Sequence, residues 1–101
     1  MAKKAQPTAG RGKTGITVEK LDEARLEAMK VKSWPIWEKE ISTFDWTYDK
    51  REQCYFLEGE VTVKPKDGKV SFGKGDFVTF PKGLACAWVV KKPVKKHYRF
   101  G

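Results

Sequence analysis

Histidine and cysteine are both scarce in this chain of 101 residues. His97 is the only histidine, which excludes the three-histidine sites that often hold catalytic zinc or iron. Cys54 and Cys86 are the only cysteines, too few for the disulfide framework of a small secreted domain. Reduced thiols in an intracellular compartment are the simpler interpretation, so we expect a cytoplasmic location.

The sequence also lacks long apolar runs. No stretch approaches the roughly 20 apolar residues of a membrane span, and no apolar segment follows the N-terminal lysines as it would in a secretory signal. We therefore expect no membrane association.

Residues 1–15 contain no acidic side chain. Their four basic residues supply half of the net charge of +8, so residues 16–101 are only mildly basic. Without hydrophobic periodicity, we expect residues 1–15 to form a disordered basic tail. It is either a solvated tail, a segment added for expression or the remnant of a transit peptide, and in the last case the location is an organelle such as a plastid.

The remaining residues, 16–101, have room for one domain with one core. Aromatic residues make up 13% of the chain, enough for a compact interior. Residues 16–18 can form a short strand. Apolar residues at spacings of three and four predict a helix over Lys20–Lys30.

From Trp34 onward the apolar residues alternate with a period of two, as in strands. Glycine and proline mark turns within residues 65–68, 73–76, 81–83 and 92–93. Many short strands separated by turns predict an all-β sandwich or closed barrel. The predicted strands cover residues 37–41, 44–48, 54–57, 60–64, 69–72, 77–80, 85–90 and 94–100.

Two stretches carry a resemblance to the cupins. Residues 52–61, Glu-Gln-Cys-Tyr-Phe-Leu-Glu-Gly-Glu-Val, resemble the first cupin motif, in which a metal-binding Glu lies seven residues before a Gly. Residues 75–86 resemble the second motif, a Gly, five residues, Pro-x-Gly and two residues before a metal-binding His, and here Cys86 takes the place of that His. The resemblance implies a cupin-type antiparallel β-barrel of the RmlC-like kind (a double-stranded β-helix or jelly roll) with one short N-terminal helix. It covers about residues 16–101.

Three flanking segments, residues 34–38, 44–49 and 96–98, resemble a narrower group of small single-domain cupins, the ureidoglycine aminohydrolase-type sequences. Many members of that group have no assigned reaction. The resemblance therefore supports the fold more than the function.

The metal-binding histidines of typical cupins are missing. The positions of their His-x-His pair hold Trp46 and Tyr48, or Asp45 and Thr47 if the loop is one residue longer. Glu52 and Cys86 remain as conventional ligands, so the resemblance implies a metal that is weakly held or absent. A thiolate ligand would favour zinc among divalent metals.

Strand alternation predicts the lining of a pocket. If Glu52 faces inward as in cupins, Cys54 shares its face, and if Cys86 faces inward, so does Trp88. Together with the aromatic residues before Glu52, these side chains predict a small-molecule pocket. The candidate ligand-binding residues are Trp46, Tyr48, Cys54 and Trp88, with core filling by the indoles and inert buried thiols as the alternative.

Glu52 is the candidate catalytic residue. A carboxylate among aromatic side chains has a large desolvation cost unless it is paired, bound to metal or protonated, and such a group is suited to general acid or base catalysis. The alternative is a surface glutamate at a strand end. Two functions stay open: an enzyme acting on a small polar nitrogen or carbonyl metabolite, and a non-catalytic cupin that binds a sugar or metabolite.

His97 lies on the strand face opposite Val94, Tyr98 and Phe100, so we interpret it as a surface or interface histidine. Residues 34–41 carry two indoles and predict a homodimer surface. The C-terminal basic residues, together with the tail, raise the alternative of nucleic-acid binding. The neighbouring aromatic residues alternate as a core pattern, which argues against it. The basic cluster consists of Lys91, Lys92, Lys95, Lys96 and Arg99.

Overall fold

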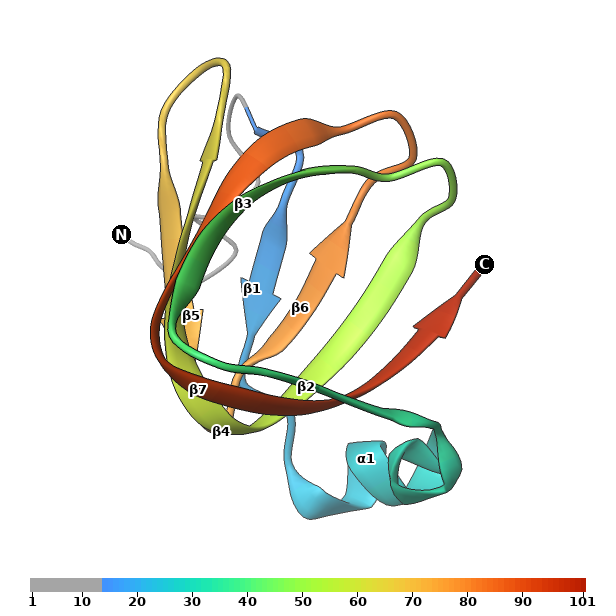
Figure 1. Cartoon of the computed structure of the whole chain (residues 1–101). Coiled ribbons are helices and arrows are strands. Elements are labelled where there is room, and N and C mark those ends of the chain that lie inside the picture. Colours follow the sequence, from blue (N-terminus) through green and yellow to red (C-terminus); the bar gives the residue numbers. More distant parts are fainter. Residues whose placement is uncertain (1–13) are drawn as a thin grey trace, which may run out of the picture.

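The computed structural model describes residues 14–101, so the predicted disordered tail lies almost entirely outside the described residues. The chain forms one strongly curved antiparallel sheet with the order β1-β6-β4-β7-β2, in which β3 also pairs with β7 and β5 with β4 (Figure 1). This confirms the predicted all-β barrel with one short helix. The strands are β1 (Thr17–Glu19), β2 (Ile36–Lys39), β3 (Ser42–Thr47), β4 (Glu52–Pro65), β5 (Val70–Gly73), β6 (Phe77–Phe80) and β7 (Ala85–Phe100).

The two long strands β4 and β7 form the frame of the barrel. They pair from Glu52 and Phe100 at one end to Pro65 and Cys86 at the other, with register shifts near residues 56–61. The predicted break of each into two strands is wrong, because the chain bends at this irregularity and stays paired instead of turning back. Gly59, at φ +119°, allows the bend, since a Cβ there would lie 2.9 Å from Val94 Cα.

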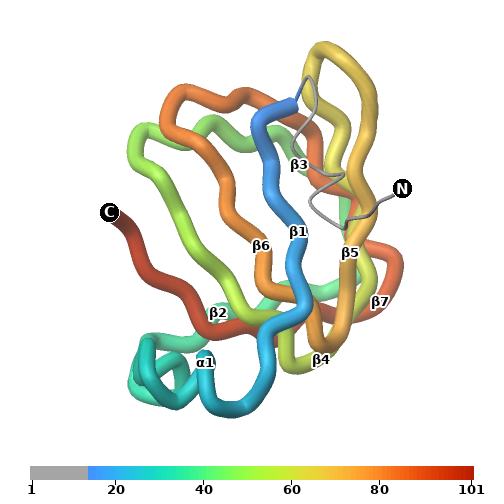
Figure 2. Tube along the Cα trace, turned by 180° about the vertical axis from the view of Figure 1, so that it is seen from behind, coloured from blue at the N-terminus to red at the C-terminus, as the bar shows by residue number. Residues whose placement is uncertain are grey.

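The helix is shorter than predicted. Helix α1 (Glu23–Ala28) begins after Asp22, whose carboxylate accepts a hydrogen bond from the Arg25 N–H at 2.8 Å. Lys30 takes a left-handed conformation and starts a 3₁₀ turn, η2 (Val31–Ser33). Both helices lie together at one side of the barrel (Figure 2). Their apolar residues pack against β6 in a second small core formed by Leu26, Val31, Trp34 and Phe77.

The main core fills the inside of the barrel with aromatic side chains. Trp88 stacks on Phe44 with ring centroids 5.8 Å apart, and Tyr48 stacks on Phe80 at 4.7 Å. The predicted alternation along β4 is confirmed, because residues 52, 54 and 56 are buried and residues 55 and 57 are more exposed. The core therefore forms by the period-two pattern of the sequence.

The segment predicted as a dimer surface turns its indoles inward. Trp34 belongs to the second core, and Trp37 packs edge-on against Trp88 at 5.9 Å. Its exposed apolar residues are instead Ile36 (48%) and Ile41 (63%). The homodimer stays a prediction, and it now depends on these isoleucines.

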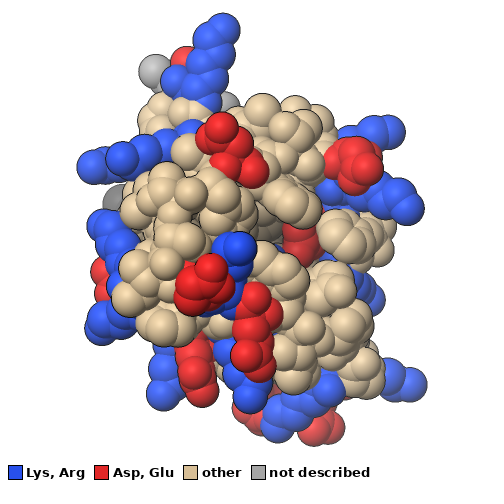
Figure 3. Space-filling model, in the orientation of Figure 1, with Lys and Arg blue, Asp and Glu red and all other residues tan. Residues whose placement is uncertain are grey.

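The charged residues do not form a single basic patch on the face in Figure 3, where lysine and arginine alternate with aspartate and glutamate. Lys96, one of the five residues of the C-terminal basic cluster, is buried. Among residues 14–101, none of the helices has the length and apolar character needed to cross a membrane.

Candidate functional site

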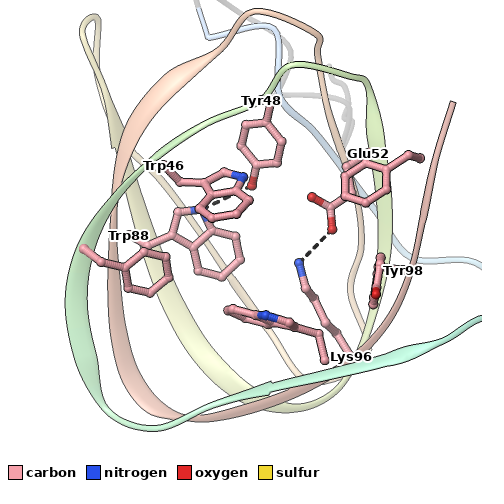
Figure 4. A pocket seen from close by; sticks show the side chains of 9 residues that line it. Trp46, Tyr48, Glu52, Trp88, Lys96 and Tyr98 are labelled. Carbon is pink, nitrogen blue, oxygen red and sulfur yellow. Dashed lines mark hydrogen bonds and ion pairs between the residues drawn. The ribbon is translucent and has the colours of Figure 1, made fainter.

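A cavity of about 210 Å³ lies inside the barrel. Trp46 (46%) and Phe100 (49%) are about half exposed, whereas Glu52 (5%) and Lys96 (4%) are buried. Figure 4 shows Lys96 and Glu52 pointing toward each other on one side of the cavity, with Trp46, Tyr48 and Trp88 on the other side. The wall is otherwise almost entirely aromatic. The lining residues are Trp37, Phe44, Trp46, Tyr48, Glu52, Trp88, Lys96, Tyr98 and Phe100.

The register between β4 and β7 brings the polar residues together. Cys54 lies opposite Tyr98 and Phe56 opposite Lys96, so alternate residues of both strands point into the same space. Glu52 stands at the start of β4 on that face. The long lysine side chain reaches it along the inside of the barrel.

Lys96 and Glu52 form a buried ion pair. Lys96 Nζ donates to Glu52 Oε2 at 3.0 Å and to Cys54 Sγ at 3.1 Å. The Cys54 thiol in turn donates to the same carboxylate oxygen at 3.2 Å. The carboxylate among aromatic side chains is thus compensated by pairing, one of the three ways that such burial becomes tolerable.

The protonation states of this cluster follow from its surroundings. Burial raises the pKa of Cys54 well above its ordinary value, so the residue stays a thiol. Burial alone would favour the neutral amine of Lys96, but its contacts with Cys54 and Glu52 outweigh this effect and raise the pKa of Lys96. Since Cys54 is uncharged, we attribute the raised pKa of Lys96 to the Glu52 carboxylate.

Three aromatic rings surround the ammonium group. Lys96 Nζ lies 4.8 Å from the ring centroid of Trp37, 5.0 Å from that of Trp88 and 5.8 Å from that of Phe56. At these distances the negative faces of the rings attract the cation. The rings and the carboxylate together fix the position of the nitrogen.

Tyr48 supplies a second polar group. Its hydroxyl oxygen accepts a hydrogen bond from Trp88 Nε1 at 3.2 Å. Burial raises the pKa of Tyr48, so it remains a neutral phenol. Among residues 14–101 no acceptor receives the hydroxyl hydrogen of Tyr48, and no donor reaches Glu52 Oε1. Both groups are therefore available to a ligand.

The structure brings some of the predicted site residues together. Trp46, Tyr48, Glu52 and Trp88 all line the cavity. Cys54 lies behind it in contact with Glu52.

Cys86 has different neighbours. It lies opposite Trp46 on β3, and burial, followed by the charge of Asp45, raises its pKa to about 11. Both cysteines are free thiols. The use of Glu52 and Cys86 as metal ligands stays a prediction, and the contacts of Glu52 within residues 14–101 are with Lys96 and Cys54 instead of Cys86.

The main residue that the sequence analysis missed is Lys96. The sequence analysis places Lys96 in the C-terminal basic cluster, although it lies an even number of residues from Val94 and Tyr98, which share one face of the predicted strand. That shared parity is the signal that would have found it. Trp37, Phe44, Tyr98 and Phe100 complete the wall.

His97 lies outside the pocket, on the strand face opposite Lys96. Of the two predicted alternatives, a surface or an interface histidine, the first is wrong, since His97 is only 7% exposed. Its Nδ1 lies 2.9 Å from the carbonyl oxygen of Trp34. The connection between the helices and β2 covers this part of β7.

The side chains do not fit the metal that the cupin motifs imply. Within the described part of the chain, no three His, Cys, Asp or Glu side chains gather as a ligand set. In addition, the ammonium of Lys96 lies against Glu52, and a protonated lysine has no lone pair for a metal.

Comparison with known proteins places these features in context. Residues 26–98 match the family described as the EutQ-like cupin domain. A DUF861 family protein from Thermotoga maritima is 53% identical, with a TM-score of 0.84 over 85% of this chain and 99% of that chain. The EutQ protein of Clostridium difficile is 25% identical, with a TM-score of 0.61 over 84% and 66% of the two chains. No curated protein matches the chain.

Proposed function

The chain belongs to the EutQ-like cupin family, and we propose that it binds a small, uncharged, polar metabolite inside its barrel. The observation that carries this proposal is the buried Glu52–Lys96 pair in an otherwise aromatic cavity. Apolar walls with a few convergent polar groups are the ordinary form of a small-molecule site.

The volume of the cavity limits the size of the ligand. A water molecule occupies about 30 Å³ of liquid, so 210 Å³ corresponds to about seven waters. Sites for drug-sized ligands begin at about 300 Å³. The cavity therefore suits a small metabolite better than a nucleotide or a peptide.

The charges of the cavity limit the chemistry of the ligand. Lys96 and Glu52 neutralise each other, so a ligand with a net charge would leave one charge unbalanced in a buried place. A neutral compound can accept a hydrogen bond from Lys96 or Tyr48 and donate one to Glu52 Oε1. Amides, ureido compounds, hydroxyketones and small sugars have both groups. The resemblance to ureidoglycine aminohydrolase-type sequences also supports nitrogen and carbonyl compounds.

Ligand binding is testable by tryptophan fluorescence, because Trp37, Trp46 and Trp88 line the cavity. A panel of urea, small amides, hydroxyketones and monosaccharides, with matched carboxylates and phosphates, is titrated into the protein. We expect saturable quenching by a neutral member that Glu52→Gln weakens and that the exposed control Glu40→Gln leaves unchanged. Preferential binding of the charged compounds, or of no compound, contradicts the proposal.

Catalysis by Glu52 is the second candidate function, favoured by the free Oε1 oxygen beside a fixed ammonium. The Glu52 carboxylate is 3.0 Å from Lys96 Nζ. If the carbonyl oxygen of a ligand binds to Lys96, Glu52 can therefore accept a proton from the same ligand as a general base. Glu52→Gln keeps the volume and removes the proton acceptor together with the charge that pairs with Lys96, so the folding of the variant is checked by circular dichroism before its activity is measured. If this variant turned over an identified substrate at the wild-type rate, the base role would be refuted.

A further inference from the structure

We propose that the Lys96 ammonium takes the place of the cupin metal, as a permanent cation built into the chain. The site would then work without metal, and Lys96 would hold the carbonyl oxygen of the ligand. The ligand part of this inference rests on the proposed function, whereas the metal part does not.

Lys96 Nζ lies beside the carboxylate that corresponds to the metal-binding glutamate of cupins. Glu52 stands where the first cupin motif has its metal-binding glutamate, and its Oε2 oxygen is 3.0 Å from Lys96 Nζ. The same nitrogen is 3.1 Å from Cys54 Sγ, a second group that could otherwise ligate a metal. The cation bound by this carboxylate is therefore the lysine.

The Lys96–Glu52 pair is buried among aromatic rings. The side chains of Lys96 and Glu52 are 5% and 6% exposed, and rings of Trp37 and Trp88 lie within 5.0 Å of Nζ. A divalent ion on Glu52 Oε2 would meet a like charge in a place where little water screens it. The lysine thus excludes a metal by charge as well as by occupying its place.

One N–H donor of the Lys96 ammonium is left for a ligand. An ammonium has three donors, and Glu52 and Cys54 accept two of them. The remaining hydrogen suits an oxygen with partial negative charge. This matches the role of a metal that polarises a carbonyl, because a fixed cation also stabilises charge that develops on that oxygen.

Metal titration of EDTA-treated protein tests the replacement without any ligand. Wild-type protein, Lys96→His and Lys95→His receive Zn²⁺, Co²⁺ or Mn²⁺, with calorimetry, thermal shift and the thiolate-to-Co²⁺ absorption band as readouts. Lys95 is the matched control because it adjoins Lys96 on β7 and is not among the cavity residues. We expect no stoichiometric binding to the wild type or to Lys95→His, and binding at least 100-fold tighter to Lys96→His, since imidazole joins Glu52 and Cys54. Where circular dichroism shows that Lys96→His does not fold, the titration of the wild type against Glu52→Gln is the test of the replacement.

Two results would overturn the inference. One is a single equivalent of metal on the wild type that Glu52→Gln abolishes. The other is a folded Lys96→His variant that binds no metal more tightly than the wild type. The ligand panel separates this failure from that of the proposed function. If a neutral ligand binds only in the presence of a metal, the inference that Lys96 replaces the metal is wrong, whereas the proposed binding of a neutral metabolite is supported. If no compound of the panel binds while the metal results are as expected, the proposed function is contradicted, whereas the inference that Lys96 replaces the metal is supported.

Discussion

The indole Nε1–H of Trp88 donates a hydrogen bond of 3.2 Å to the hydroxyl oxygen of Tyr48, which lies 40 positions earlier in the chain. Trp88 is on β7, whereas Tyr48 follows the end of β3 and stacks on Phe80 of β6. The hydrogen bond and the stacking contact together therefore link β7, the end of β3 and β6 at the wall of the cavity. The hydrogen bond also orients the phenol, whose hydrogen is directed to no acceptor in residues 14–101.

Tyr48→Phe should destabilise the protein by about 1–3 kcal/mol, because it leaves the buried indole N–H of Trp88 without its acceptor. Tyr98→Phe is the matched control, since the structure gives its hydroxyl no hydrogen bond within residues 14–101. Its expected cost is below about 0.5 kcal/mol. Urea unfolding measures both. Equal costs would show that the Tyr48–Trp88 bond contributes nothing specific.

The sequence predicts most of this cavity because strand alternation is a local property. Glu52, Cys54 and Phe56 lie on one face of β4 as the period of two requires. The partner of Glu52 was not predicted, since lysine is mostly a surface residue and Lys96 stands in a run of other lysines. Pairing of β4 with β7 brings residues 52 and 96 together, and such a long-range pairing leaves no local trace in the sequence.

The ends of the strands also depend on long-range pairing, which the local sequence does not reveal. The predicted strands leave a gap at residues 58–59 and a turn at residues 92–93, yet Gly59 and Pro93 both lie within long strands. Glycine and proline mark a bulge as well as a turn. Only the pairing partner, here the opposite bend near Val94, decides between these two outcomes.

Gly59→Ala should destabilise the fold strongly. The added Cβ would lie 2.9 Å from Val94 Cα, in addition to the strain of φ +119°. Gly68→Ala is the matched control, because Gly68 has a similar φ of +107° and nothing within 4 Å of the added Cβ. We expect about 1–2 kcal/mol for Gly68→Ala and at least about 2 kcal/mol more for Gly59→Ala. If chemical denaturation gave the same loss for both, the close approach of β4 and β7 at this bend would be wrong.

Stability should fall at alkaline pH. In the unfolded chain cysteine loses its proton near about pH 8.5, tyrosine near about 10 and lysine near about 10.4. In the folded chain the pKa values of Cys54 and Tyr48 are raised by burial, that of Cys86 is raised to about 11, and that of Lys96 is raised by its partners. The folded state therefore keeps protons that the unfolded state has released, so its stability decreases as pH rises.

The thiols should set the start of this decrease. Their contribution is complete below about pH 8.5 and declines above it, while that of Lys96 is complete below about pH 10.4 and is lost as pH rises through its folded pKa. Removing both thiols by Cys54→Ala and Cys86→Ala should move the onset to about pH 10. Urea unfolding between pH 7.5 and 10.5 measures how steeply the free energy of unfolding falls with pH in the wild type and in the double variant. An unchanged slope between pH 8.5 and 10 in the double variant would rule out the thiols as its cause.

The energetics of the Lys96–Glu52 pair are best tested by a double-mutant cycle. Lys96→Met replaces the unbranched apolar stem of the side chain but leaves the Glu52 carboxylate buried without its cation, which should cost about 3–5 kcal/mol. Adding Glu52→Gln removes the uncompensated charge. The double variant should therefore be more stable than Lys96→Met alone, even though it carries one more substitution.

The exposed pair of Lys92 and Glu60 provides the control for this cycle. Its Nζ–Oε1 distance is 3.7 Å and its side chains are 72% and 50% exposed, so Lys92→Met should cost less than about 1 kcal/mol and Glu60→Gln should not restore stability. All variants are compared by urea unfolding at pH 7. If Lys96→Met cost no more than Lys92→Met, the ammonium would not compensate the carboxylate, and Glu52 would need another cation.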